Sequence, residues 1–166
     1  MAADPAGGGG RAVLDLLLVC PDGSSLAQLT ALRPWSRQHR PWWVCPPTPE
    51  ARSVLRGERV RWSLRPVEDP LTGSTLVDLA MNVGPAWRAL RHVRPDVVLA
   101  CGAAAVPFLG LARLLRIPGV YLQDCDRPDD PGVLDRICRS LADRTVVPWE
   151  ELAVLDPDCD VVGCLL

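Results

Sequence analysis

The segment after the first apolar run contains residue types that could bind an anion. Gly23, Ser24 and Ser25 follow Asp22 and lead into leucines at helical spacing. Backbone N–H groups at a helix N-terminus, together with the helix dipole, favour an anion such as a phosphate. The alternative is that Ser24 or Ser25 only caps the helix. The segment lacks the G-x-G-x-x-G pattern of dinucleotide sites, so these residues alone do not decide between the two.

Small residues form a second candidate segment. Gly102, Ala103 and Ala104 come directly after an apolar run that ends at Cys101. Side chains this small let the backbone approach another surface closely, and that surface is either a ligand or the protein's own sheet.

An acidic loop is the third candidate segment. Residues 123–130 contain four aspartates and one arginine. Asp126 and Arg127 could pair and order this loop around a substrate. The alternative is a solvated acidic loop that leads into the next helix.

Composition excludes several classes of function. The net charge of −2 and the pI of about 5.6 argue against a general surface for nucleic acid. All 18 basic residues are arginines, which excludes lysine Schiff-base and P-loop chemistry. Seven cysteines without a C-x-x-C pair, and two histidines, predict no disulfide framework and no metal site. No cofactor is expected either. This cysteine usage fits a reducing cytosol.

The order of apolar runs predicts the elements that must position these segments. Residues 1–11, which are rich in glycine, are expected to be a flexible leader, and 12–166 a single α/β domain. Continuous apolar runs are typical of strands that are covered on both faces of a parallel sheet. Strands are predicted at 13–20, 41–45, 59–64, 96–101, 119–123, 144–147 and 160–163.

Helical segments between these strands predict a doubly wound, mostly parallel, Rossmann-like sheet. Helices are expected after Ser25 and at 75–93, 106–116, 133–141 and 149–155. Ligands of such sheets bind beyond the carboxyl ends of the strands, where all three candidate segments fall.

The helix at 75–93 has the clearest periodicity. Its apolar stripe consists of Leu76, Leu79, Ala80, Val83, Trp87 and Leu90. We expect this stripe to face the core and the helix to kink at Gly84-Pro85, the alternative being that it faces a partner or a membrane.

Two further patterns have simpler explanations. Arginines and tryptophans alternate between Arg33 and Trp43, which would suit a membrane surface or a stacked sugar. However, Trp42-Trp43 falls in a predicted strand, where at least one ring should face the core. Glu150-Glu151 fits a helix start better than an acid/base pair. No apolar run reaches the roughly 20 residues of a membrane span.

Taken in order, several motifs resemble one family. They are 22–29 (DGSSLAQL), 94–98 (RPDVV), Gly102-Ala103, 106–108 (VPF), Tyr121-Leu122, Asp126-Arg127, 149–151 (WEE) and Val162-Gly163. From about residue 13 to residue 166, their order and spacing are similar to oligosaccharide biosynthesis proteins of the Alg-fourteen/PssD type.

The resemblance implies the N-terminal half of a split GT-B glycosyltransferase. A partner chain would supply the C-terminal half and most of the UDP-sugar site. The pair would transfer a sugar to a polyprenyl-diphosphate-linked acceptor at the cytoplasmic face of a membrane, with peripheral attachment to the membrane surface. The expected acceptor- and diphosphate-binding residues are Gly23, Ser24, Ser25, Gly102, Ala103, Ala104, Asp126 and Arg127.

The sequence departs from the family pattern at two positions that bear on catalysis. Ser25 stands where the family usually has a histidine, and a serine cannot act as a general base near neutral pH. Gln123 stands where related chains commonly carry glutamate. If the histidine takes the acceptor's proton in the family, Asp22 or Asp124 must do so here, or catalysis is weak.

Three interpretations follow. The first is the acceptor-binding, scaffolding subunit of a heteromeric glycosyltransferase in polysaccharide or glycolipid assembly. The second is a family member that has lost catalysis and acts only as a binding or recruitment module, which Ser25 and Gln123 favour. The third is an independent nucleotide-binding domain, which ranks lowest because no acidic residue follows the second strand at Cys45 to bind a ribose.

Overall fold

Parallel strands form the centre of the computed structural model, which describes residues 12–21, 23–67, 72–124, 132–147 and 160–161. Their order is β3-β2-β1-β4-β5-β6-β7, and every neighbouring pair is parallel. The strands are β1 (Asp15–Val19), β2 (Arg40–Cys45), β3 (Val60–Trp62), β4 (Val97–Cys101), β5 (Gly119–Leu122), β6 (Arg144–Val147) and β7 (Asp160–Val161). Each predicted strand is therefore present, most of them somewhat shorter than predicted.

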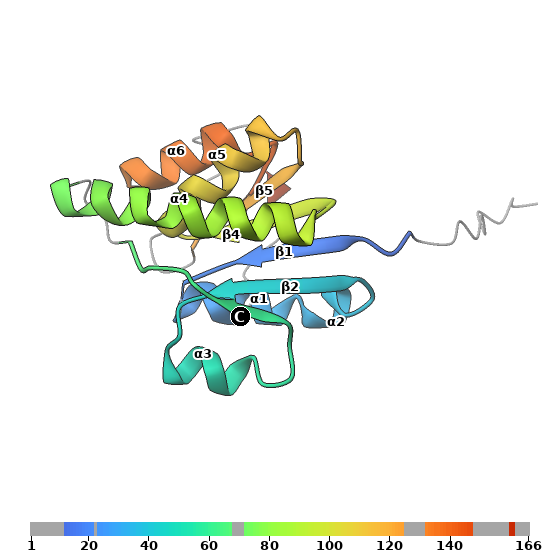
Figure 1. Cartoon of the computed structure of the whole chain (residues 1–166). Helices are drawn as coiled ribbons and strands as arrows, with labels where there is room; N and C mark the ends of the chain where they lie inside the picture. Colours follow the sequence, from blue (N-terminus) through green and yellow to red (C-terminus); the bar gives the residue numbers. More distant parts are fainter. Residues whose placement is uncertain (1–11, 22, 68–71, 125–131, 148–159, 162–166) are drawn as a thin grey trace, which may run out of the picture.

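Helices cover both faces of this sheet (Figure 1). They are α1 (Ser24–Ala31), α2 (Arg33–Ser36), α3 (Pro49–Val54), α4 (Gly73–Val93), the short 3-10 helix η1 (Ala103–Ala105), α5 (Val106–Leu114) and α6 (Val133–Leu141). Figure 1 shows α1, α2 and α3 on one face and α4, α5 and α6 on the other. Together with the strand order, which reverses between β1 and β4, this is the doubly wound, Rossmann-like architecture that the sequence predicts.

Burial on both faces explains the continuous apolar run of β1. Leu17 and Val19 pack on the side of α4 and α5, whereas Leu16 and Leu18 pack on the side of α1 and α3. All four side chains are at most 1% exposed. Successive side chains of a strand point to opposite faces, so a strand with helices on both sides needs apolar residues at every position.

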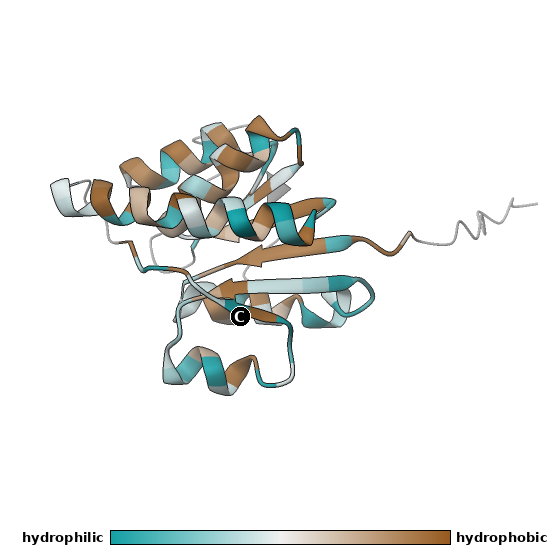
Figure 2. Cartoon of the chain, in the orientation of Figure 1, coloured by the Kyte–Doolittle hydropathy of each residue, from teal (hydrophilic) through white to brown (hydrophobic). Residues whose placement is uncertain are grey.

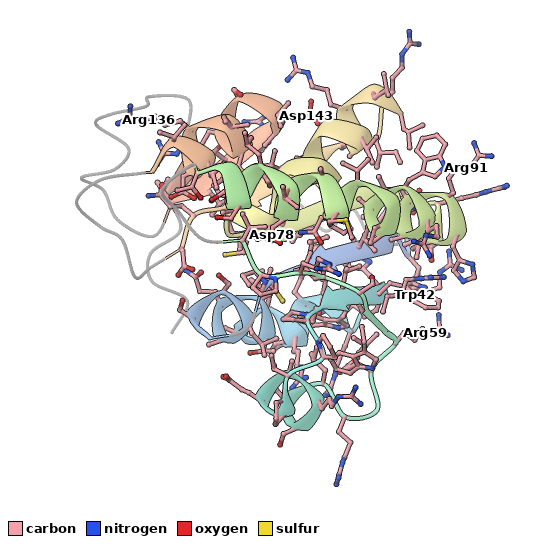
Figure 3. The ribbon with its side chains drawn as sticks, turned by 60° about the vertical axis from the view of Figure 1, so that its left-hand side comes forward. Trp42, Arg59, Asp78, Arg91, Arg136 and Asp143 are labelled. Carbon is pink, nitrogen blue, oxygen red and sulfur yellow. The ribbon has the colours of Figure 1, made fainter. Side chains whose placement is uncertain are left out.

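The two tryptophans of β2 also lie on opposite faces. Trp43 is completely buried in the core beneath α1 and α3, which confirms that at least one ring faces the core. Trp42 is half-buried and contacts the His92 ring edge-on, with ring centroids 5.7 Å apart. The Arg59 guanidinium lies 5.7 Å from the centre of the Trp42 ring (Figure 3).

Helix α4 does not bury the stripe that was predicted for it. Leu90 is buried, but Leu76, Val83 and Trp87 are 57%, 45% and 41% exposed. The buried positions are Thr75, Asn82, Ala86, Ala89 and Leu90. Apolar residues occur all round the first four turns of this helix, so their spacing did not identify the inner face.

Apart from Leu90, the inner face of α4 is made of small and polar residues for structural reasons. Ala86 and Ala89 lie in the same core cluster as residues of α5. Their small side chains let α4 and α5 approach each other closely. The Asn82 amide accepts a hydrogen bond from Arg65 N at 2.9 Å and donates one to Arg65 O at 3.0 Å, so it is satisfied although fully buried. The helix continues through Pro85, and the kink expected at Gly84-Pro85 remains a prediction.

Two sequence predictions, the leader at 1–11 and the helix at 149–155, lie outside the described residues. In the described part of the chain, no helix has the length and apolar character needed to cross a membrane.

Candidate functional site

The segments that follow β1 and β4 lie where the strand order reverses, which is the usual ligand position in open α/β sheets. Both turn on glycines with left-handed backbone angles, with φ of 72° at Gly23 and 76° at Gly102. A Cβ on Gly102 would lie 3.0 Å from Pro21 Cγ and 3.4 Å from Ser25 Oγ, so a larger residue would push the two loops apart. A Cβ on Gly23 would meet no described atom within 4 Å.

The hydroxyls at the start of α1 bind the carboxylate that follows β5. Ser24 Oγ donates to Asp124 Oδ1 at 2.8 Å, and Ser25 Oγ donates to Asp124 Oδ2 at 2.6 Å. The carboxylate therefore lies at the positive end of the α1 dipole, which stabilises its charge. The N-cap of α1 is Gly23, with no side-chain cap hydrogen bond, so the alternative that a serine caps this helix is wrong.

Gln28 connects α1 to the ends of β4 and β5. Its Nε2 donates to the Gln123 carbonyl at 3.2 Å, and its Oε1 accepts from Cys101 Sγ at 3.4 Å. From α6, Arg139 donates a hydrogen bond to the side-chain oxygen of Gln123. The position where the family commonly has a glutamate is thus a buried, neutral amide that is paired with an arginine.

The small residues after β4 divide between the core and the surface. Ala103 and Ala104 belong to η1, the single turn that leads into α5. Gly102 and Ala104 are buried, whereas Ala103 is partly exposed. Ala104 packs in the core on the side of α4 and α5, so part of the close approach is made to the protein itself.

A buried polar pair lies close to the Gly102 loop. Tyr121 Oη donates to Asp135 Oδ1 at 2.6 Å, and the Cys138 thiol lies 4.0 Å from the Gly102 carbonyl. Burial raises the pKa of the Tyr121 phenol well above its usual value, and Cys138 and Asp135 raise it further. Burial also raises the pKa of the Cys138 thiol, and the negative charge of Asp135 raises it further. Both groups are therefore neutral at physiological pH.

This pair predicts a loss of stability in alkali. In the unfolded chain, the ordinary pKa values of 9.0 for Cys138 and 10.0 for Tyr121 return, while both are higher in the folded state. The stabilising contribution is complete below these unfolded values and is lost as pH rises above them, by about 1.4 kcal/mol per pH unit for each group. Urea unfolding at pH values between about 8 and 11 should show this fall in the free energy of unfolding, because this range brackets the pKa values of both groups in the unfolded chain.

Cys138→Ala is the matched variant for the alkaline experiment. The chain has one tyrosine and no lysine, so the other groups that titrate in this range are thiols, and the variant removes only the Cys138 thiol. The variant should lose less stability per pH unit than the native chain once the thiol titrates. An unchanged slope would contradict the assignment of the effect to Cys138.

Three predicted site residues, Asp22, Asp126 and Arg127, lie outside the described residues. Of the two candidate catalytic carboxylates, the structure describes Asp124, which it brings to Ser24 and Ser25. Within the described ranges, no group of three His, Cys, Asp or Glu side chains could hold a metal ion.

Sequence reasoning missed two polar residues that hold the site together. Gln28 lies between Leu26 and Leu29 on the buried face of α1, and a long polar side chain at such a position was the available signal. Arg139 gave no comparable signal, because arginines are common on exposed helix faces and its partner Gln123 comes from another element.

No protein-family model and no curated protein sequence matches this chain. Solved structures do match. MurG from Acinetobacter baumannii is similar with a TM-score of 0.60 at 17% identity, over 81% of this chain and 41% of MurG. S. aureus MnaA in complex with UDP is similar with a TM-score of 0.65 at 17% identity, over 90% of this chain and 44% of MnaA. The glycosyltransferase SsfS6 from Streptomyces sp. SF2575 gives 0.56 at 11% identity, over 89% and 53%.

These matches decide the fold. The chain has the fold of half a GT-B protein. It spans about half the length of the structures that it matches, which is consistent with the N-terminal GT-B half expected from the sequence. At identities of 10–17%, the likeness establishes the GT-B half as a fold, and the Alg-fourteen/PssD type remains a prediction.

Proposed function

We propose that this chain is the acceptor-binding and scaffolding subunit of a heteromeric, UDP-sugar-dependent glycosyltransferase. It would act on a polyprenyl-diphosphate-linked acceptor in polysaccharide or glycolipid biosynthesis. The observation that carries the proposal is a GT-B half in which Ser24 and Ser25 of α1 hold the Asp124 carboxylate at the carboxyl ends of the strands. Among proteins of similar fold, MnaA binds UDP and SsfS6 is a glycosyltransferase, which supports a UDP-sugar donor shared with a C-terminal-half partner.

Asp124 is the general base in this proposal. Ser25 replaces the histidine usual in the family and orients the carboxylate instead of taking the proton. Asp124 accepts the proton of the acceptor hydroxyl while that oxygen forms a bond to the anomeric carbon of the UDP-sugar. The bond from that carbon to UDP breaks at the same centre, and UDP leaves with the electron pair.

The acceptor diphosphate would bind to the backbone at the start of α1. The hydroxyls of Ser24 and Ser25 are used by Asp124, so the first-turn N–H groups and the Gly23 turn supply the phosphate contacts. Gly102, Ala103 and Ala104 would line the neighbouring side of the cleft. Asp126 and Arg127 would complete it, with Arg127 offsetting the negative charge of the diphosphate.

Gly23→Ala should lower sugar transfer about tenfold to a hundredfold, because a displaced first turn of α1 no longer positions the diphosphate. Gly23 has φ 72° and ψ −139°, a conformation that residues with a Cβ rarely adopt. Gly57→Ala is the matched control, since Gly57 has φ 84° and equally open surroundings but lies in the turn after α3. Equal losses of transfer in both variants would contradict a specific role for Gly23.

The experiment that tests the proposal is label transfer from a UDP-sugar to lipid-linked acceptor in membranes. It compares this chain alone, a candidate C-terminal-half partner alone, and both together. Transfer only with both chains is the expected result. A stable complex without transfer, in membranes where a known pair is active, would reject the glycosyltransferase and favour the recruitment module. Full transfer by the partner alone would reject both.

A further inference from the structure

The outward face of α4 is an exposed apolar surface. We call this surface the α4 outer face; it consists of exposed apolar residues followed by Arg88 and Arg91. The apolar residues are Leu76, Val77, Ala80, Met81, Val83, Gly84 and Trp87. Val77 and Leu76 are 61% and 57% exposed, and Met81 is 49% exposed. A contiguous exposed surface of large apolar side chains is unusual in a soluble domain and marks a contact with something else.

The α4 outer face changes from apolar to basic along the helix. One row runs from Leu76 through Val83 and Trp87 to Arg91, at spacings of three and four residues once Ala80 is included. The neighbouring row starts at Val77 and ends at Arg88. Both rows are therefore apolar in the first turns and end in an exposed arginine.

Trp87 lies at the boundary between the two parts. The Arg91 guanidinium lies 5.2 Å from the centre of its ring, and Figure 3 shows Arg91 at the outer end of α4. Arg94 follows as an exposed cation at the helix C-cap, whereas the single acidic residue of the helix, Asp78, is half-buried. A ring with an apolar body and a polar edge beside a cation is favoured at the headgroup level of a membrane.

The orientation of α4 relates this face to the candidate site. Helix α4 begins on the side of the molecule toward which β1 and β2 point, and it runs back toward the amino ends of the strands (Figure 1). Figure 2 shows the hydrophilic residues concentrated in the second half of the helix. The apolar part thus lies toward the edge of the sheet that carries Asp124, and the basic part lies at the opposite edge.

We propose that the α4 outer face docks on an anionic lipid bilayer. Leu76, Val77, Met81 and Trp87 would enter the boundary between headgroups and acyl chains, while Arg88 and Arg91 would contact lipid phosphates. Charge complementarity favours a bilayer over a protein groove, because both rows end in cations that a negatively charged surface would neutralise. The choice of a bilayer rests on the proposed function, since a polyprenyl-linked acceptor is held in a membrane next to this edge of the sheet.

Vesicle flotation of the full-length chain tests the proposal. One set of vesicles is phosphatidylcholine alone, and the other is equal parts of phosphatidylcholine and phosphatidylglycerol. The net charge of the chain is −2, so non-specific attraction to anionic vesicles is not expected. We expect binding to the mixed vesicles that weakens with added salt, and much weaker binding to phosphatidylcholine alone.

Paired variants separate the two parts of the face. Arg88→Gln with Arg91→Gln should weaken binding to the mixed vesicles about 25-fold, roughly fivefold for each arginine. Leu76→Gln with Trp87→Gln should weaken it at least about tenfold. Val133→Gln on α6 and Arg56→Gln after α3 replace exposed residues away from this face and should leave binding unchanged. All substituted positions are exposed, so circular dichroism should show native helix content.

The outcomes that would overturn the proposal are distinct. Binding that is equal in all variants, or absent from the mixed vesicles, rejects a lipid-docking face. If the chain does not bind vesicles but self-associates, and the Leu76→Gln and Trp87→Gln double variant abolishes this self-association, the face binds a second copy of the chain. Vesicle flotation needs neither a sugar donor nor a partner chain. Vesicle binding that depends on the α4 outer face therefore supports the docking surface even if sugar transfer fails. Sugar transfer without such vesicle binding supports the proposed function and rejects the docking surface.

Discussion

Asp124→Asn should lower kcat/KM for sugar transfer about a thousandfold in the complex of the two chains. The amide keeps the size of the carboxylate but has no site for the acceptor's proton. Ser24 and Ser25 now donate to the two carboxylate oxygens, and the amide offers them one acceptor oxygen in place of two. The measurement is initial-rate transfer with the lipid-linked acceptor at several concentrations, so that kcat and KM are separated.

A matched control separates a base role for Asp124 from the loss of a surface charge. Glu50→Gln, which removes an exposed carboxylate from the first turn of α3, should keep the native kcat/KM. If Asp124→Asn lowered thermal stability and left kcat/KM within about twofold of native, Asp124 would be a structural anchor for the loop and not a base.

Trp43→Ala should lower the free energy of unfolding by about 3–5 kcal/mol. The Trp43 ring is completely buried between β2 and the helices α1 and α3, and no small residue can fill the space it leaves. The helix that carries Ser24 and Ser25 packs on the same core, so this loss would also loosen the start of α1. Urea unfolding followed by circular dichroism measures the change.

Trp43→Phe is the matched comparison for this prediction. The indole Nε1 is buried without a hydrogen-bond partner among the described residues, so phenylalanine removes volume but no described hydrogen bond. The expected loss is less than half of that in Trp43→Ala, since most of the ring volume is kept. Similar losses in both variants would show that the indole nitrogen has a partner that stabilises it.

The sheet was predictable from sequence because strands that are buried on both faces appear in the sequence as continuous apolar runs. In β4 apolar residues occupy every position, and in β1 they occupy every position after Asp15. Turn residues between the runs then fix the alternation of strands and helices. The inner face of α4 left no such pattern, because, apart from Leu90, the helix has alanines, Thr75 and Asn82 inward and larger apolar residues outward.

The candidate site was predictable only as a set of segments. The position of Gly23 to Ser25 and Asp124 at strand ends followed from the order of the elements, but the bonds between them did not. Those bonds join residues 99 and 100 positions apart, and no local pattern specifies such a pairing. The same reason explains why Ser25 resembled a helix cap and why the Tyr121–Asp135 pair gave no signal.

The distance along the chain between the site's partners determines when the site can form. β1 pairs with β4, whose residues come some eighty positions later, and Asp124 follows one strand beyond. Closing loops of this length costs entropy before the central strands repay it, which slows the folding of such parallel sheets. During synthesis, α1 and its two serines therefore wait without their carboxylate until β5 has left the ribosome. Any interruption of translation before residue 124 yields a chain that has the first loop but no assembled site.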